Sequence, residues 1–247
     1  MLKHLKSDSN MKDKSNNLFV SGIIVAAGSG TRMGTVAKPL IKLGKKTVFE
    51  YVLEAFLASS VDEIVVVCTD KAALMPLISF DAKKPISFAE GGKTRALSVY
   101  NGVSQTRKGE GLVCIHDCAR PFVTTEIIDS VIEAAAVSGV ATASHPVTDT
   151  IKYINTEAKT IYTPERKFLF SVQTPQVFIK NIYMISFALA QKQCFTSTDE
   201  TSMAENAGFS VTYVETSKNN IKLTTPDDIK TAKAMLYLQE RNEKFER

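Results

Sequence analysis

One stretch of this sequence decides the fold, and it reads Ile23-Ile24-Val25-Ala26-Ala27-Gly28-Ser29-Gly30-Thr31-Arg32-Met33-Gly34, with Lys38-Pro39 just beyond it. The run from Phe19 to Val25 is mostly apolar and rich in β-branched residues, a pattern typical of a strand buried on both faces of a parallel sheet. The run breaks sharply at glycine. The chain is therefore predicted to open with a buried strand that ends in a glycine-rich loop.

The loop after this strand combines close backbone approach with positive charge. Gly28 and Gly30 lack Cβ atoms, so a phosphate or a nucleoside can come close to the backbone N–H groups. Arg32 and Lys38 add two cations beside them. The pattern is not a P-loop, because Gly30 is not followed by Lys and Ser or Thr. Gly34 also falls one residue too late for the dinucleotide fingerprint. The loop favours a nucleoside triphosphate, and a turn without a ligand is the alternative.

Composition indicates a globular protein with a local cationic site. The chain has 247 residues, of which 44% are hydrophobic, and a net charge of only +4 with acids and bases intermixed. This balance argues against a nucleic-acid partner. No apolar run approaches the length of a membrane span, so no membrane association is expected. The four cysteines form no CxxC pair, which predicts a reduced, cytoplasmic setting.

Residues 1–17 differ from the rest of the chain. They are rich in Lys, Ser and Asn with almost no apolar periodicity, and are predicted to be a disordered leader. They lack the apolar segment of a secretory signal. Asp8 and Asp13 argue against an organelle transit peptide, and Met11 is an alternative start. Residues 18–247 are expected to form a single domain.

Strands and helices alternate over the first 146 residues, which predicts an α/β fold with a doubly wound, mostly parallel sheet. Thr47 and Glu50 have the spacing of a capping box for a helix that ends near Ala58. Further strands are expected at 61–68, 86–89, 111–115, 140–146 and 209–214. Further helices are expected at 70–78, 124–138, 181–191, from about 199, and from 226 to about 239.

A second glycine turn, Gly91-Gly92, lies at the end of the strand at 86–89 and precedes a helix. Two glycines in this position are typical of a ligand-binding turn. Arg95 falls in the first helical turn, and Ser98 lies one turn after Thr94. An ordinary strand-to-helix turn is the alternative.

Asp117 follows the strand at 111–115, in the segment His116-Asp117-Cys118-Ala119-Arg120-Pro121. A carboxylate at the end of a strand beside the first loop is well placed to hold Mg²⁺, which takes oxygen ligands and keeps waters and substrate phosphates. The alternative is that Asp117 pairs with Arg120 or caps the helix that begins near Thr124. His116 is expected to be structural.

The α/β pattern is interrupted after residue 146. Residues 147–154 alternate as a strand, 155–158 read as a turn and 159–163 as the returning strand. A lone hairpin cannot bury a face by itself. The arm at about 147–166 is therefore expected to project and to pack against a second subunit.

A series of motifs, in order, resembles the 2-C-methyl-D-erythritol 4-phosphate cytidylyltransferase family of the sugar-nucleotidyltransferase superfamily, over about residues 22–238. The matching segments are Ala26 to Met33, Gly91 to Val99, His116 to Pro121, Gln173-Thr174-Pro175-Gln176 and Asn220-Ile221-Lys222-Leu223-Thr224. The segment Thr198-Asp199-Glu200 also recurs in the family. Its expected role is structural, with Thr198 or Asp199 capping a helix.

The resemblance implies a Rossmann-like fold, an Mg²⁺ cofactor, a homodimer with a hairpin dimerisation arm, and a reaction of CTP with a polyol phosphate that releases pyrophosphate. Arg32 and Lys38 would stabilise the transition state, and Arg166 and Lys222 would orient the incoming phosphate. Asp117 would serve the metal. The expected nucleotide contacts are Ala26, Ala27, Gly28, Ser29, Gly30, Thr31, Gly92, Lys93, Arg95 and Ser98. The expected polyol phosphate contacts are Arg120, Thr150, Arg166 and Lys222.

This sequence departs from the family pattern in three places. Lys93 stands where an acid or a small polar residue is usual, and Cys118 replaces an alanine. The order Ala37-Lys38-Pro39 replaces Pro-Lys, so Lys42 is the alternative catalytic lysine. Two other functions remain open. One is a ribitol-5-phosphate cytidylyltransferase, although the small residues after Asp117 favour the erythritol enzyme. The other is a CTP-binding sensor without turnover.

Overall fold

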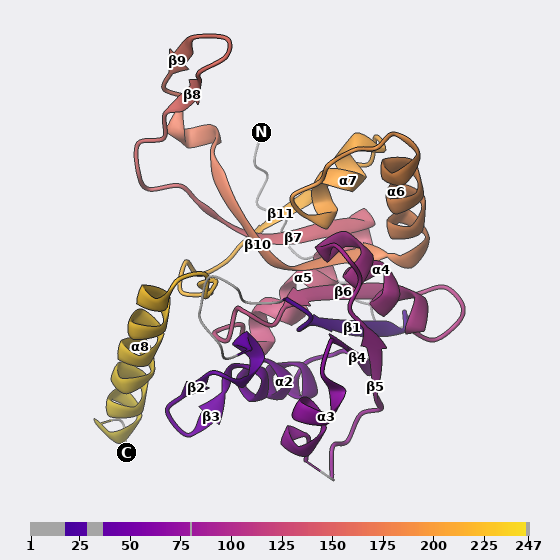
Figure 1. The fold of residues 1–247 in the computed structure, drawn as a ribbon, viewed down its shortest axis with the longest axis vertical. Helices are drawn as coiled ribbons and strands as arrows, with labels where there is room; N and C mark the ends of the chain where they lie inside the picture. The colour runs from indigo at the N-terminus through magenta and orange to yellow at the C-terminus, as the bar shows by residue number, and fades with distance from the viewer. Residues whose placement is uncertain (1–17, 29–36, 80, 246–247) are drawn as a thin grey trace.

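A seven-stranded sheet organises this protein, shown in a computed structural model that describes residues 18–28, 37–79 and 81–245 (Figure 1). The order across the sheet is β11-β7-β10-β6-β1-β4-β5. The strands are β1 (Val20–Val25), β4 (Glu63–Cys68), β5 (Ile86–Glu90), β6 (Leu112–Asp117), β7 (Val140–Pro146), β10 (Phe170–Ile179) and β11 (Thr212–Glu215). The predicted leader at 1–17 and the predicted site residues Ser29, Gly30, Thr31 and Arg32 lie outside the described residues.

The sheet is mostly parallel, as predicted. β1 lies between β4 and β6 and is parallel to both, and β4 continues in parallel to β5. β11 is parallel to β7. β10 is the exception, because it runs antiparallel between β6 and β7. The α/β fold class is confirmed, with one reversed strand in the middle of the sheet.

Helices cover both faces of the sheet. They are α2 (Val48–Ala58), α3 (Lys71–Leu74), α4 (Arg95–Gln105), α5 (Thr125–Ser138), α6 (Lys180–Lys192), α7 (Glu200–Asn206) and α8 (Pro226–Phe245). Successive side chains of β1 point to opposite faces. Ile24 therefore packs with residues of α2 and α5, while Ile23 packs with residues of α4 and α6. This is the doubly wound arrangement that the sequence alternation predicted.

The capping box predicted for α2 is present. The Thr47 hydroxyl accepts the Glu50 N–H at 3.2 Å, and the Glu50 carboxylate accepts the Thr47 N–H at 2.6 Å. A small hairpin that the sequence did not predict, β2 (Lys42–Leu43) with β3 (Lys46–Thr47), leads into this cap. α8 continues past the expected end near residue 239. Among the described residues, no helix combines the length and the apolar character needed to cross a membrane.

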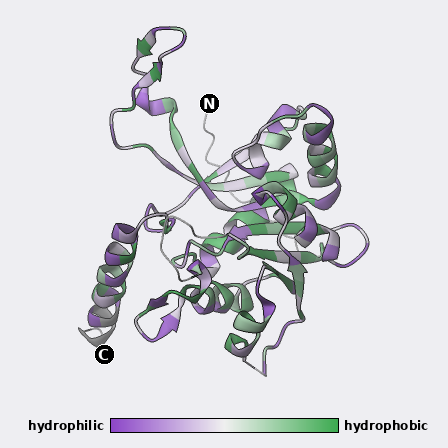
Figure 2. Ribbon diagram, viewed as in Figure 1, coloured by the Kyte–Doolittle hydropathy of each residue, from purple (hydrophilic) through white to green (hydrophobic). Residues whose placement is uncertain are grey.

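The arm projects from one end of the sheet (Figure 1), and part of it consists of hydrophobic residues (Figure 2). Its paired strands are short: β8 (Tyr153–Asn155) pairs with β9 (Thr160–Tyr162). Ile154 is 61% exposed and Ile161 is 69% exposed. The strand expected at 147–154 begins only at Tyr153, so the prediction is wrong for residues 147–152. The ladder between β7 and β10 ends at the Pro146–Phe170 pair. Beyond it the Val147 N–H still donates to the Leu169 carbonyl at 3.0 Å, but residues 148–152 pair with no strand in the described part of the chain.

His116 ties β6 to β10. Its Nδ1 lies 3.0 Å from the Thr174 hydroxyl, and its Nε2 lies 3.2 Å from the Arg120 carbonyl. The Thr174 hydroxyl also accepts the Asp117 N–H at 3.1 Å. A neutral ring with its proton on Nε2 satisfies all three contacts. Burial lowers the pKa of His116 to about 4, although the Arg120 carbonyl and the Asp117 charge oppose this. The structural role expected for His116 agrees with these contacts.

Acid is expected to destabilise the protein through His116. Between pH 6.5 and about 4 the unfolded chain protonates this histidine and the folded chain does not, so the free energy of unfolding falls as the pH is lowered. The stabilisation is complete above pH 6.5, and a shift of this size corresponds to about 3 kcal/mol. Urea unfolding across this pH range should show a weaker pH dependence for His116→Gln. The partly exposed His145→Gln is the matched control and should keep the wild-type slope, and an unchanged slope in His116→Gln would contradict the assignment.

Candidate active site

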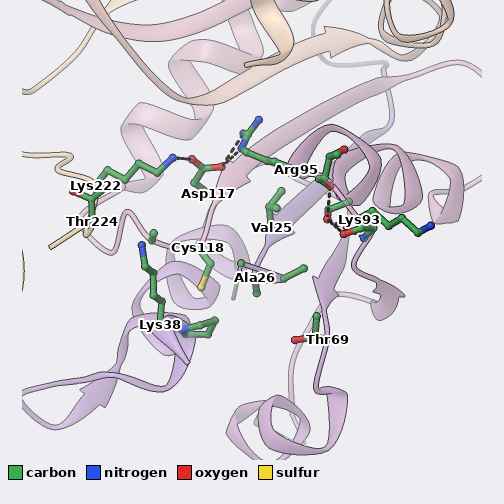
Figure 3. A pocket seen from close by; sticks show the side chains of 17 residues that line it. Val25, Ala26, Lys38, Thr69, Lys93, Arg95, Asp117, Cys118, Lys222 and Thr224 are labelled. Atoms are coloured by element: carbon green, nitrogen blue, oxygen red, sulfur yellow. Dashed lines mark hydrogen bonds and ion pairs between the residues drawn. The ribbon is translucent and has the colours of Figure 1, made fainter. Parts of the chain in front are cut away.

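A cavity of about 660 Å³ lies at the carboxyl ends of β1, β4, β5 and β6 (Figure 3). Ligands of doubly wound sheets bind at this edge, because the loops leaving adjacent parallel strands converge there. The lining residues are Val25, Ala26, Ala27, Gly28, Lys38, Pro39, Thr69, Gly92, Lys93, Thr94, Arg95, Ser98, Asp117, Cys118, Ala119, Lys222 and Thr224.

Most of the site residues expected from the sequence line this one cavity. Those that do are Ala26, Ala27, Gly28, Lys38, Gly92, Lys93, Arg95, Ser98, Asp117 and Lys222. Three expected residues are not in its lining. Arg120 is partly buried, and Thr150 and Arg166 are exposed at the two ends of the arm. Lys42, the alternative lysine, is exposed on β2 and is not in the lining either.

The Gly91-Gly92 turn forms one wall of the cavity. A Cβ at Gly91 would lie 2.5 Å from the Ala27 side chain, and one at Gly92 would lie 2.5 Å from the Leu97 side chain. The Ser98 hydroxyl accepts the Gly92 N–H at 2.9 Å and donates to the Thr94 carbonyl at 3.0 Å. A larger residue at Gly91 would push the turn away from the first loop, and one at Gly92 would collide with the start of α4. Ser98 therefore fixes the shape of the turn.

Asp117 lies at the centre of an ionic network (Figure 3). Its Oδ1 accepts from Arg95 Nε at 3.0 Å and from Arg95 Nη2 at 2.7 Å, and its Oδ2 accepts from Lys222 Nζ at 2.6 Å. Burial alone would raise the pKa of Asp117, but the charges of Arg95 and then Lys222 hold this pKa well below its usual range. The carboxyl is therefore ionised at neutral pH.

The two alternatives considered for Asp117 do not describe its side chain. Arg120 donates instead from Nη1 to the Asn220 carbonyl at 2.8 Å. The cap of α5 is Thr124, whose hydroxyl accepts the Ile127 N–H. The carboxylate of Asp117 thus faces the cavity, where both of its partners come from other elements.

Glu200 extends the network away from the cavity, and the sequence analysis missed this role. Both of its carboxylate oxygens accept from Arg95 Nη1, at 2.7 and 2.8 Å. Glu200 is the buried first residue of α7, while Asp199 caps that helix by accepting the Ser202 N–H at 3.0 Å. Burial raises the pKa of Glu200, and the Arg95 charge opposes this rise. Acids are common in first helical turns, so its position alone gave no sign of this contact.

Hydrogen bonds to backbone carbonyls hold the Lys222 loop against β10 and the residues that follow β6. The Leu223 N–H donates to the Ala119 carbonyl at 2.8 Å, and Lys38 Nζ donates to the Leu223 carbonyl at 3.0 Å. Asn220 Nδ2 donates to the Thr174 carbonyl at 2.8 Å. Lys38 and Lys222 are therefore brought to the same side of the cavity, although 184 positions separate them in the sequence.

Cys118 and Thr69 also line the cavity. Burial, with a smaller contribution from Asp117, raises the pKa of Cys118 far above its usual range, so it is a neutral thiol. Thr69 directly follows β4 and was not singled out from the sequence. The convergence of parallel strand ends at one edge is the rule that could have found it.

The donor set in the cavity suits Mg²⁺ bound largely through a substrate. Asp117 is the carboxylate among the lining residues, and the described part of the chain contains no group of three or more His, Cys, Asp or Glu placed to hold a metal. One carboxylate together with substrate phosphates matches the usual coordination of Mg²⁺. Four cations (Lys38, Lys93, Arg95 and Lys222) line the same space, which fits polyanionic ligands.

Comparisons with known proteins agree with this geometry. Residues 20–238 match the family described as IspD: 2-C-methyl-D-erythritol 4-phosphate cytidylyltransferase. The chain is 39% identical to the enzyme of that name from Caldanaerobacter subterraneus subsp. tengcongensis, with 88% of this chain and 98% of the relative covered. It is also 39% identical to the one from Clostridioides difficile, with 90% and 96% covered.

Solved structures give the same result. The 4-diphosphocytidyl-2C-methyl-D-erythritol synthase from Anaerococcus prevotii superposes with a TM-score of 0.82 at 29% identity, covering 93% of this chain and 100% of that one. The 2-C-methyl-D-erythritol 4-phosphate cytidylyltransferase from Thermus thermophilus superposes with a TM-score of 0.71 at 30% identity, covering 88% of this chain and 98% of that one. With a family match over nearly the whole described domain and relatives of this similarity, the chain belongs to the 2-C-methyl-D-erythritol 4-phosphate cytidylyltransferase (IspD) family.

Proposed function

We propose that this protein joins CTP and 2-C-methyl-D-erythritol 4-phosphate to give 4-diphosphocytidyl-2-C-methyl-D-erythritol and pyrophosphate, a step of non-mevalonate isoprenoid synthesis. Membership of the family supports this reaction. The observation that carries it on this chain is the cationic cavity, in which an ionised Asp117 lies between Arg95 and Lys222. Such a cavity suits two phosphorylated substrates.

The substrate itself supplies the nucleophile in this reaction. An oxygen of the polyol phosphate attacks the α-phosphorus of CTP, a new P–O bond forms, and the bond to the β-phosphate breaks to release pyrophosphate. A phosphate monoester is already anionic near neutral pH, so no protein nucleophile is needed. The neutral Cys118 thiol fits this reading. The protein then acts by in-line positioning and by stabilising charge.

Lysines on one side of the cavity are assigned to the phosphates. Lys38 lines the cavity and lies beside the Lys222 loop, which supports it over the exposed Lys42 as the catalytic lysine. Lys38, with Arg32, would stabilise the charge that develops on the triphosphate. Lys222 would orient the incoming phosphate. Because it now pairs with Asp117, it must exchange that partner for a phosphate oxygen.

Asp117 is assigned to Mg²⁺. When bound, the ion would neutralise negative charge on the triphosphate. The remaining nucleotide contacts are assigned to the first loop and the Gly91-Gly92 turn. Because this turn is tightly packed, we expect it to accept a pyrimidine and to exclude a purine by size.

The arm is proposed to form a homodimer with shared active sites. Its exposed apolar residues and the paired rings of Tyr153 and Tyr162 would cover those of a second arm across a two-fold axis. Arg166 Nη1 donates to the Thr148 carbonyl, which keeps the guanidinium at the base of the arm. From there Arg166 and Thr150 would reach the partner's polyol phosphate. Arg120 is also assigned to the polyol phosphate, and its guanidinium would have to exchange the Asn220 carbonyl for a phosphate oxygen.

The cellular setting is proposed to be the cytoplasm, and residues 18–247 are proposed to act as one domain. The four cysteines are free, and three of them are buried. Free thiols of this kind are typical of proteins in a reducing compartment.

The reaction is tested by a pyrophosphate-release panel that crosses CTP, UTP, ATP and GTP with the erythritol and ribitol phosphates. We expect release only with CTP and 2-C-methyl-D-erythritol 4-phosphate. The glycine turn is proposed to select the base, and the acceptor is the one that the family uses. Faster release with ribitol 5-phosphate would favour the ribitol enzyme. CTP binding with no release from any pair would indicate a sensor.

Lys38→Ala is expected to lower kcat about a hundredfold, because loss of one preorganised charge from a transition state costs on the order of 3 kcal/mol. Affinity for CTP should change much less. Lys42→Ala is the matched control, since this lysine is exposed four residues later, and it should retain near wild-type activity. Steady-state pyrophosphate release measures both. A severe Lys42→Ala with a mild Lys38→Ala would reverse the assignment.

Mixed dimers test the shared site. Arg166→Ala and Lys222→Ala should each be inactive alone. Random re-pairing of equal amounts should recover about a quarter of wild-type activity, since half the dimers are mixed and one of their two sites is intact. Subunit exchange is verified independently with differently tagged chains. Exchange without recovery would place Arg166 in its own chain's site or outside any site.

A further inference from the structure

The guanidinium of Arg95 is shared between two carboxylates that have different surroundings. Asp117 faces the cavity, whereas Glu200 is buried and does not line it. The two acids lie on β6 and α7, and Arg95, the first residue of α4, bridges them. A buried ion pair is by itself weak evidence for a stabilising role. We therefore ask what the contact between Arg95 and Glu200 contributes to the site.

Glu200 decides how Arg95 meets Asp117. Because Nη1 is held by both oxygens of Glu200, Arg95 reaches Asp117 with the opposite edge of its guanidinium. Nε and Nη2 both donate to Oδ1. Oδ2 is left to Lys222 and the cavity. A guanidinium that was free to turn would form the usual two-oxygen fork with a carboxylate and would engage Oδ2 as well.

Glu200 also balances the charge beside Asp117. The network contains two carboxylates, Asp117 and Glu200, and two cations, Arg95 and Lys222. Lys222 must leave Asp117 if it is to meet a phosphate. With Glu200 present, the Arg95–Glu200 pair is then neutral and Asp117 keeps a net negative charge. Without it, the unpaired Arg95 would offset that charge and repel a divalent cation.

We propose that Glu200 is a positioning residue that keeps Oδ2 of Asp117 available for the divalent cation that accompanies the nucleotide. This inference rests on the proposed role of Asp117 and goes beyond it, because it assigns a function to a residue outside the cavity. Groups that orient a metal ligand through a second contact typically change metal affinity by about 10- to 100-fold when they are mutated.

The test measures CTP binding by calorimetry in the absence of metal and at saturating Mg²⁺, on the full chain without the polyol phosphate. The quantity compared is the gain in CTP affinity that Mg²⁺ provides. Glu200→Gln, which keeps the shape and removes the charge, should reduce this gain about tenfold. Its metal-free CTP affinity should be unchanged, which a merely structural defect would not allow. Paramagnetic resonance of Mn²⁺ should show the same loss for Mn²⁺ binding with CTP.

Three further variants make the result decisive. Glu205→Gln is the matched control, because it removes an exposed carboxylate from the same helix and should keep the wild-type gain. Asp117→Asn should abolish the gain. Arg95→Lys keeps the charge but cannot bridge both acids, so it should weaken the gain. If Glu200→Gln loses metal-free CTP binding, the gain measured for Arg95→Lys tests the inference in its place.

The outcomes separate this inference from the proposed function. If Asp117→Asn loses the gain and neither Glu200→Gln nor Arg95→Lys does, the inference alone is overturned. If Asp117→Asn binds Mn²⁺ with CTP as the wild type does, the metal role of Asp117 fails and this inference fails with it. The pyrophosphate-release panel still tests the reaction in that case.

Discussion

The active-site edge of this protein depends on one buried carboxylate held between two cations. Asp117 ends β6 at the middle of the sheet, and Arg95 and Lys222 reach it from α4 and from the loop before α8. Burying a lone carboxylate is costly, so its position requires both partners. The contacts join three segments that lie far apart in the sequence, and they set the shape of one side of the cavity.

The fold makes this contact possible by bringing strand ends together. β1, β4, β5 and β6 are parallel neighbours, so the loops that follow them meet at one edge. β10 then enters antiparallel, between β6 and β7. Thr174 on this strand accepts the Asp117 N–H, and its carbonyl accepts from Asn220. The reversed strand thereby fixes both Asp117 and the loop that carries Lys222.

The network also indicates how the cations of the site are paired before the substrates bind. Among the described residues, four cations assigned to a phosphate have a partner within the protein: Lys222 has Asp117, Lys38 has the Leu223 carbonyl, Arg166 has the Thr148 carbonyl, and Arg120 has the Asn220 carbonyl. Incoming phosphates would replace these partners. Each cation would then exchange one partner for another, and none of these cations would be left unpaired. Glu200, placed behind Arg95, would keep Asp117 negative while that exchange takes place.

Local patterns in the sequence determined the elements and most of the lining of the cavity. Apolar runs predicted the parallel strands of the sheet but not β10, the Thr47–Glu50 spacing predicted a cap that is present, and the Gly91-Gly92 turn predicted one wall of the cavity. These features depend on neighbours within a few residues, so sequence alone can reveal them. Tertiary structure decided the rest. The pairing of Asp117 with Arg95 in place of Arg120, the contact of Glu200 with Arg95, and the end of the β7–β10 ladder before the arm depend on segments 22 to 105 positions apart or on strand pairing. No local pattern encodes such contacts, because they exist only once the sheet has brought distant strand ends to the same edge.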